Sequence, residues 1–306
     1  MLAKTMKVLV TGGAGFIGSN LVEELIRRGE DVTVLDNFST GSTENLESVR
    51  GEVKVLRATC SMIPKLKLSK TELVFHIGIP SSSPMYRENP LLVGESINEF
   101  IKVFGLAKKN KAKIIYASTS SMYGRCKPPH REDMVSEPFD YYTEARVAME
   151  RLARVYHELY GVNSVGMRFF SVYGPHEKAK GKYANVVSQF IWNIREDKPP
   201  VIYGDGTQTR DFVHVSDVVS ACLKAAWADL GCEVINVGTG KSTTFNRAAE
   251  LVSRFFGKSI KPEYRPNPIK NYVYHTLADL TKARKLIGYE PEVTLEEGVR
   301  RLVKEG

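Results

Sequence analysis

The 306-residue sequence predicts an α/β fold in which a parallel sheet has helices on both faces and a smaller lobe follows. Two observations support this prediction. Short apolar runs alternate with amphipathic stretches through the first half of the chain, which is the order that forms a doubly wound parallel sheet. Near Arg168 the alternation ends, and a loop-rich stretch with shorter elements begins. The second half is therefore expected to form a lobe packed onto the first.

The first half of the chain supplies the elements of the expected sheet. Strands are predicted where apolar residues form short continuous runs, because strands of a parallel sheet are buried on both faces. Helices are predicted where apolar residues recur every three to four positions. The expected strands are 7–11, 31–36, 53–57, 72–77, 112–118 and 164–169, and the expected helices are 16–29, 89–110 and 141–160.

The second half has shorter elements and longer connections. A loop is expected at 171–176, and an extended loop at 262–272, where proline and asparagine are frequent. We assign residues 1–170 to the first domain, with 211–240 packing back onto it, and residues 171–306 to the smaller lobe. Further along the chain we expect strands at 201–203 and 233–237 and helices at 183–196, 244–256, 279–287 and 294–304.

Composition excludes several classes of protein. Hydrophobic residues make up 42% and charged residues 25% of the chain, as in soluble globular domains, and no apolar run approaches a membrane span in length. The net charge of +8 is spread over many expected helices without a nucleic-acid motif. We therefore expect a solvated basic surface, with neither a nucleic acid nor a membrane as partner. The scattered cysteines predict reduced thiols, a cytoplasmic location and no metal site; they are Cys60, Cys126, Cys222 and Cys232.

A glycine-rich turn is the strongest functional signal. Gly12, Gly15 and Gly18 lie three apart, between the first expected strand and the first expected helix. In such a turn the first glycine allows a sharp bend, the second allows close approach of a pyrophosphate, and the third allows the helix to pack on the sheet. The helix N-terminus adds free N–H groups and a positive dipole. The context of strand, turn and helix predicts a dinucleotide site.

Asp36 indicates which dinucleotide binds. It ends the second expected strand, where a carboxylate accepts hydrogen bonds from the ribose hydroxyls and repels a 2′-phosphate. No arginine follows directly, because residues 37–41 read Asn-Phe-Ser-Thr-Gly. The predicted cofactor is NAD rather than NADP.

Two further segments have side chains suited to acid–base chemistry. The strand expected at 112–118 ends in a cluster of hydroxyl residues that includes Thr119, at the sheet edge where ligands bind. Tyr142, Arg146 and Glu150 lie four apart, so they share one face of the helix expected at 141–160. A phenol held near a fixed cation loses its proton more readily and can act as a base.

These motifs resemble those of the extended short-chain dehydrogenase/reductases, in the NAD-dependent sugar epimerase/dehydratase group. The resemblance covers essentially the whole chain. It includes the glycine turn, the serine-rich strand end with Tyr123-Gly124, the helix 142–150, and the segments 168–175, 204–212, 236–238 and 277–283. It implies a Rossmann-type domain that holds NAD, a C-terminal lobe that holds a nucleotide sugar, and a homodimer formed through helices within 89–110 and 141–160.

The resemblance also implies roles for individual residues. Thr119, Tyr142 and Arg146 correspond to the catalytic positions, and Arg210 corresponds to an arginine that contacts the substrate phosphates. Residues expected to bind substrate are Thr119, Tyr142, Ser171, Val187, Tyr203 and Arg210. Residues expected to bind the cofactor are Gly12, Gly15, Phe16, Ile17, Gly18, Asp36, Asn37, Thr40, Gly41, Thr59, Cys60, Ile77, Gly78, Ile79, Ser118, Tyr142, Arg146 and Phe169.

The chain departs from the family pattern at several positions. Arg146 replaces a lysine that holds the nicotinamide ribose, and a forked guanidinium is not equivalent to an ammonium group. Thr59 stands where an aspartate is expected to contact adenine, and Ser96 stands where an asparagine is usual.

The residues after Thr119 reduce the number of candidate reactions within this family. The dehydratases of this family need an acid here and the decarboxylases a glutamate, but Ser120 and Ser121 are hydroxyl residues. Cys126 is out of register with the cysteine of the epimerase-reductase branch. By elimination, the expected function is 4-epimerisation of a UDP-hexose, UDP-glucose and UDP-galactose being the expected pair. Another NAD-dependent reaction on the same scaffold and a non-catalytic nucleotide-binding homologue remain as alternatives.

Overall fold

The computed structural model describes residues 5–134, 137, 139–268 and 271–305. Its main element is a seven-stranded parallel sheet in the order β11-β6-β5-β4-β1-β2-β3. The chain order reverses between β1 and β4, and such a switch point opens a crevice at the carboxyl ends of the strands. The strands are β1 (Lys7–Thr11), β2 (Asp31–Asp36), β3 (Lys54–Arg57), β4 (Leu73–His76), β5 (Lys113–Thr119), β6 (Ser164–Phe169) and β11 (Cys232–Val237). The predicted fold class is confirmed.

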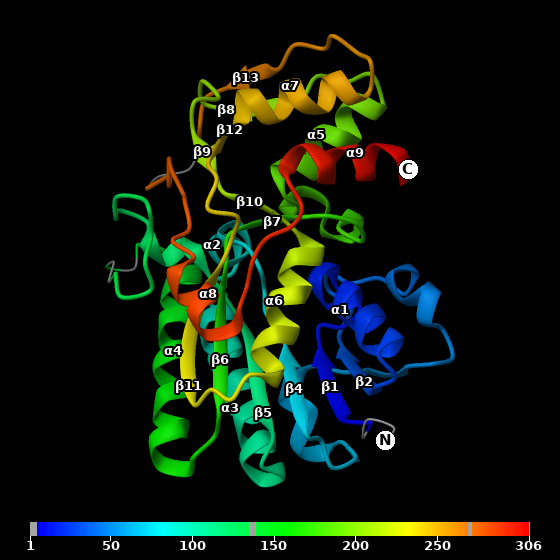
Figure 1. Ribbon diagram of the computed structural model, residues 1–306, viewed down its shortest axis with the longest axis vertical. Coiled ribbons are helices and arrows are strands. Elements are labelled where there is room, and N and C mark those ends of the chain that lie inside the picture. Colours follow the sequence, from blue (N-terminus) through cyan, green and yellow to red (C-terminus); the bar gives the residue numbers. More distant parts are fainter. Residues whose placement is uncertain (1–4, 135–136, 138, 269–270, 306) are drawn as a thin grey trace.

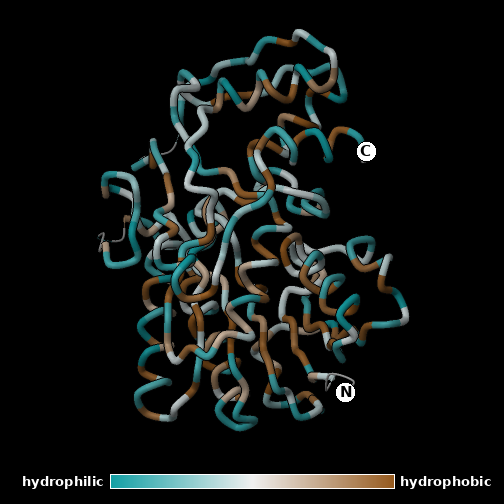
Figure 2. Tube along the Cα trace, in the orientation of Figure 1, coloured by the Kyte–Doolittle hydropathy of each residue, from teal (hydrophilic) through white to brown (hydrophobic). Residues whose placement is uncertain are grey.

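Helices cover both faces of the sheet (Figure 1). On one face α1 (Phe16–Arg27) contacts α6 (Val215–Trp227), and on the other α3 (Leu92–Asn110) contacts α4 (Tyr141–Tyr160). Figure 2 shows hydrophobic residues along the strands and hydrophilic residues along many of the connecting loops. Short helices fill several connections between strands and long helices: α2 (Ser83–Glu88), η1 (Glu44–Val49), η2 (Cys60–Lys65), η3 (Ser120–Tyr123) and η4 (Lys178–Tyr183).

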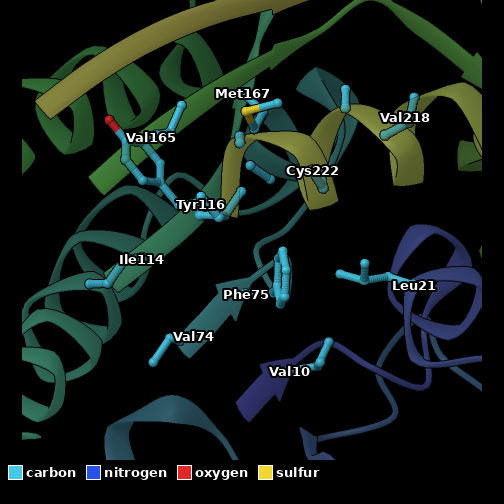
Figure 3. Close-up of a cluster of buried hydrophobic side chains, with 14 of the residues drawn as sticks. Val10, Leu21, Val74, Phe75, Ile114, Tyr116, Val165, Met167, Val218 and Cys222 are labelled. Carbon is cyan, nitrogen blue, oxygen red and sulfur yellow. The ribbon is translucent and has the colours of Figure 1, made fainter. Parts of the chain in front are cut away.

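Alternate residues of the strands fill two apolar layers. Phe75 lies near Leu21 of α1, on the side of the sheet that also packs against α6 (Figure 3). Tyr116 points to the opposite side, where its ring makes edge contacts with Phe100 and Phe104 of α3. All of these side chains are nearly or fully buried, so the sheet fixes the height and angle of both helix layers.

A second apolar core holds the smaller lobe together. It lies between α5 (Val186–Arg195), α7 (Phe245–Phe255) and α9 (Leu295–Glu305). The strand pairs of this part of the chain are β7 (Ser171–Tyr173) with β10 (Phe212–His214), β8 (Val201–Tyr203) with β13 (Glu263–Arg265), and β9 (Thr209–Arg210) with β12 (Thr243–Thr244).

The chain passes between the two cores more than once. After β10 it returns along α6 to the main core and adds β11 to the sheet, and α7 then lies in the second core. The α8 helix (Thr281–Ile287) packs against β11, and α9 returns to the second core.

Several local expectations differ from the structure. The loop expected at 171–176 contains β7, and the extended loop expected at 262–272 contains β13; residues 269–270 of it lie outside the described residues. No helix was predicted from the sequence where the structure has α6 (Val215–Trp227). The helix expected at 89–110 begins at Leu92, because Asn89 precedes a proline and adopts an extended conformation. No helix in the described parts of the chain is long and apolar enough to cross a membrane.

Candidate active site

The glycine turn is shaped by close backbone packing. Gly12 has a φ of 70°, and a Cβ atom there would lie 2.3 Å from the Cα of Gly78. A Cβ atom on Gly18 would lie 2.0 Å from the carbonyl oxygen of Gly12. At Gly15, in contrast, the only nearby atom is that same oxygen, at 3.2 Å. Two glycines are therefore required by the protein itself, whereas Gly15 leaves a bare backbone surface facing the pocket.

The N-terminus of α1 faces the same pocket. Gly15 is its N-cap and has no side chain, so the first-turn amides of Phe16 and Ile17 lie beside the pocket without a capping side chain. These amides and the helix dipole suit the pyrophosphate of a dinucleotide. Asp36 ends β2, and its carboxylate accepts the N–H groups of Ala14 at 2.9 Å and Phe38 at 2.7 Å. These bonds hold the carboxylate at the pocket wall, where it has lone pairs left for ribose hydroxyls.

The residues expected to bind cofactor converge on two adjoining pockets at the carboxyl ends of the strands. Fourteen of them line the first pocket: Gly12, Gly15, Phe16, Ile17, Gly18, Asp36, Asn37, Thr40, Gly41, Thr59, Cys60, Ile77, Gly78 and Ile79. The others, Ser118, Tyr142, Arg146 and Phe169, line the second pocket. Because Phe16, Ile17, Ile77 and Ile79 line both, the two pockets form one continuous cleft.

Thr119 is held at the end of β5 in the second pocket. Its Oγ1 accepts a hydrogen bond of 3.1 Å from the N–H of Ser121, which caps η3. The hydroxyl therefore uses an acceptor position within the protein and keeps its hydrogen for a group in the cleft.

Tyr142 lies in the first turn of α4 and lines the same pocket. Asp140 caps this helix by accepting the N–H of Thr143 at 2.8 Å, which fixes where α4 begins. The Tyr142 ring packs against Tyr86, with 5.4 Å between the ring centroids. The Cζ of Arg146 lies 5.1 Å from the centroid of the Tyr142 ring. The phenol is thus fixed from two sides, with a cation below its ring.

Arg146 is buried, and its guanidinium is held by backbone carbonyl groups. It donates to the Pro80 oxygen at 2.8 Å and to the Ala117 oxygen at 3.3 Å. These contacts tie the loop after β4 to the end of β5. They also explain how arginine is accommodated in place of lysine, since the longer side chain reaches two carbonyl groups.

A buried polar network holds α4 against the sheet. Glu150, two turns after Tyr142, forms an ion pair of 2.7 Å with Arg168 of β6. It also accepts the Ser118 hydroxyl at 2.6 Å. Arg168 in turn donates to the Tyr123 hydroxyl, at 2.8 Å. The network links α4 to two neighbouring strands, and Ser118, expected at the cofactor, takes part in it.

His76 is close to this centre but remains uncharged at neutral pH. Burial, with the Arg146 charge as a second cause, lowers the pKa of His76 to about 3. Its Nδ1 pairs with the Thr11 hydroxyl at 2.7 Å. The imidazole is therefore a structural group that joins β4 to β1.

The residues expected to bind substrate are only partly brought together. Thr119, Tyr142, Ser171 and Arg210 line the second pocket, but Val187 and Tyr203 do not. Val187 is completely buried in the second core, and Tyr203 is 46% exposed on β8. Arg210 lies between two rings, with its Cζ 5.4 Å from the centroid of Phe245 and 5.1 Å from that of Tyr272.

The structure adds residues that the sequence reading missed. Lys180 of η4 lines both pockets, pairs with Glu177 at 2.9 Å and lies 5.4 Å from the Phe16 ring centroid. Tyr272 enters the second pocket, and Glu99 of α3 enters the first. These residues lie on elements distant in sequence from the motifs, and no spacing in the sequence links them to the cleft.

Comparison with known proteins identifies the family. The model of the NAD dependent epimerase/dehydratase family matches residues 8–238. The chain belongs to this family. A putative UDP-glucose 4-epimerase from Methanocaldococcus jannaschii is 34% identical over 301 residues, with 97% of each chain covered. A UDP-glucuronate 4-epimerase from Thermodesulfobacterium geofontis is also 34% identical, covering 96% of this chain and 94% of the relative.

A solved structure has the same fold. The UDP-glucose 4-epimerase of Thermotoga maritima, determined with UDP-glucose, has a TM-score of 0.92 and 33% identity, with 98% of each chain covered. The resemblance predicted from the sequence is confirmed, as are the enzyme class and NAD as cofactor. The bare backbone at Gly15 and the acceptor at Asp36 fit this cofactor.

Proposed function

We propose that the protein interconverts UDP-glucose and UDP-galactose, which differ at C4 of the hexose. The observation that supports this reaction is the cleft around Tyr142, where Thr119 lies in the same pocket and is followed by two serines. A dehydration needs an acid beside the sugar to remove water, and Ser120 and Ser121 are poor acids. An exchange of configuration at one carbon needs only a base, a hydrogen-bond donor and a reversible hydride acceptor.

The chain's own residues account for the proton steps. Tyr142 removes the proton of the C4 hydroxyl group and later returns it, and Thr119 donates a hydrogen bond to the same oxygen. Arg146 places a positive charge below the Tyr142 ring, with 5.1 Å between its Cζ and the ring centroid. NAD would supply the hydride acceptor, so that no net oxidation results. Arg210 holds the diphosphate while the 4-keto sugar turns its other face to the cofactor.

The cofactor would lie along the first pocket. Its pyrophosphate would approach Gly15 and the N-terminus of α1, its adenosine ribose would bind Asp36, and its nicotinamide end would reach Tyr142 in the second pocket. Lys180 lines both pockets and pairs with Glu177. Its ammonium group is placed to stabilise negative charge where cofactor and substrate meet.

A second substrate is favoured by the charge of the cleft. Arg87 and Lys180 line the second pocket, and Ser120 and Ser121 belong to the same lining. Cations with neighbouring hydroxyl donors suit a carboxylate at C6 of the sugar. UDP-glucuronate, the substrate named for one relative, is therefore the second candidate.

The test is direct conversion followed by NMR. Purified protein would be incubated with UDP-galactose or with UDP-glucuronate, each with and without added NAD⁺. We expect the 4-epimer of UDP-galactose to appear without accumulation of NADH. Stoichiometric NADH would indicate a net oxidoreductase, and conversion of UDP-glucuronate alone would select the second substrate. No turnover with either sugar, and no NAD binding, would indicate a non-catalytic homologue.

We also propose that the protein is a cytoplasmic homodimer whose interface includes the outer face of α4. Val155 and Leu159 on this helix are 47% and 65% exposed, and such apolar residues are common at interfaces. The four free cysteines suit a reducing compartment. Light scattering after size exclusion would measure the mass, and Leu159→Glu should convert a dimer into monomers.

A further inference from the structure

The part of the first pocket between α3 and the turn after β3 contains a carboxylate that the sequence motifs do not include. Glu99 lies on α3, whose N-terminal half lines this pocket. Its Oε1 is 3.4 Å from the backbone N–H of Ser61, which donates to it from η2. The side chain is half-buried beside Thr59 and Cys60, which line the same pocket. The carboxylate is therefore positioned by the α3–η2 contact rather than extended into solvent.

The order of features along the pocket shows which part of the cofactor would reach Glu99. The pyrophosphate of NAD would lie against Gly15, and its adenosine ribose would lie against Asp36. Beyond Asp36 the pocket continues between the turn after β3, at 58–60, and α3. The base attached to that ribose would lie in this section. This placement rests on the proposed binding of NAD along the first pocket.

The edge of adenine offers a definite pattern of groups. Its exocyclic amino group donates hydrogen bonds, whereas its ring nitrogens accept them. An ionised carboxylate only accepts, so it complements the amino group and no other part of that edge. The turn after β3 has a threonine and a cysteine at positions 59 and 60. Glu99 is the carboxylate next to that turn, and it comes from a different element.

We propose that Glu99 recognises the adenine of NAD, its carboxylate accepting a hydrogen bond from the exocyclic amino group. The neighbouring hydroxyl of Thr59 can donate or accept and so can complete the pattern with a ring nitrogen. Burial is the largest influence on Glu99 and raises the pKa of its carboxyl group, while bonds from Ser61 and Thr59 lower it. A hydrogen bond donated by the amino group of bound adenine would compensate the Glu99 carboxylate for the solvation that it loses on burial.

The experiment compares NAD with nicotinamide hypoxanthine dinucleotide, in which a carbonyl oxygen replaces the amino group. Nucleotide-free protein would be titrated calorimetrically with each, so that no turnover is needed. A charge-assisted hydrogen bond corresponds to a preference of about tenfold or more for NAD. Glu99→Gln should reduce this preference to within about threefold, because an amide can donate to the carbonyl oxygen as well as accept. Glu99→Asp should retain part of the preference.

The matched control is Glu52→Gln, which removes the same charge from an exposed side chain in the turn before β3, outside the lining of the first pocket. This variant should keep the wild-type preference. The proposal is wrong if wild-type protein binds both dinucleotides equally, or if Glu52→Gln changes the ratio as much as Glu99→Gln. A fall in melting temperature with an unchanged ratio in Glu99→Gln would show that Glu99 only supports η2. Because binding is measured, failure of the proposed epimerase activity would not alter these outcomes.

Discussion

At the scale of single residues, the site depends on how Arg146 is held. Its guanidinium donates to two backbone carbonyl groups and lies below the Tyr142 ring. A lysine has one terminal nitrogen and could not reach both carbonyl groups while keeping the same position. The substitution therefore joins two functions in one side chain: it fixes the cleft wall, and it places charge near the phenol.

Tyr142→Phe should reduce turnover by roughly a thousandfold, because it removes the hydroxyl group that we propose as the base for the sugar proton. The melting temperature should change little, since the ring contacts with Tyr86 and Arg146 do not use the hydroxyl group. Tyr141→Phe is the matched control, because this neighbouring tyrosine is 52% exposed and should retain activity. Near-normal turnover in Tyr142→Phe would contradict the assignment of the base.

Arg146→Lys and Arg146→Met separate the two functions of the arginine. The lysine variant keeps the charge but loses at least one carbonyl contact, so its unfolding free energy should fall by about 1–3 kcal/mol. Its kcat should stay within about tenfold of wild type, whereas kcat of the methionine variant should fall by about a hundredfold or more. Urea unfolding and steady-state kinetics would measure both. Wild-type kcat in Arg146→Met would show that the charge does not assist Tyr142.

At the scale of secondary-structure elements, local patterns predicted most of the main sheet. The glycine turn and the alternation of strand and helix depend on neighbouring residues, and they predicted β1, α1 and β2 closely. The α6 helix was missed for a physical reason. Most of its residues are buried, including Val218, Ala221 and Cys222, and the polar stripe that identifies a surface helix is narrow here, formed by Ser216, Ser220 and Lys224.

Non-local contacts explain the other differences. The β7 and β10 strands are three residues long and exist because they pair with each other across a long insertion. Contacts between distant segments also decide which residues line the cleft. Motif positions predicted Thr119 and Tyr142 there, but Glu99 and Lys180 reach the cleft from elements whose place depends on tertiary packing.

Glu150→Gln tests the ion pair that links α4 to β6. Glu150 and Arg168 have side chains that are 11% and 9% exposed, so the variant leaves a buried positive charge without its partner. The unfolding free energy should fall by about 3–5 kcal/mol. Arg247→Met breaks an exposed pair with Glu250 on α7 and should cost less than about 1 kcal/mol. Equal losses in both variants would contradict the importance of burial at Glu150.

At the scale of the whole molecule, buried histidines should make the fold sensitive to acid. Burial lowers the pKa of His76 to about 3, with Arg146 contributing, and lowers that of His214 to about 4. The unfolded chain takes up protons near the ordinary pKa of about 6.5, where both folded histidines remain neutral. Stability is therefore fully present above about pH 6.5 and falls as the pH decreases toward 4.

The pH dependence can be assigned by comparing variants. Within this window each buried histidine contributes a slope of at most about 1.4 kcal/mol per pH unit. His76→Gln should give a shallower dependence of unfolding free energy on pH, measured by urea titration at several pH values. His275→Gln replaces an exposed histidine and should leave the slope unchanged. An unchanged slope in His76→Gln would show that His76 is not the responsible group.

The repeated passage of the chain between the two cores has a consequence for biosynthesis. The sheet gains its edge strand β11, and its cover α6, only after β7, α5 and β8 of the intervening segment have left the ribosome. A nascent chain that ends near residue 170 would expose the flank of β6 and the apolar surface that α6 later covers. The first half should therefore depend on chaperones until synthesis passes Val237, and the cleft is complete only once Thr276 has been added.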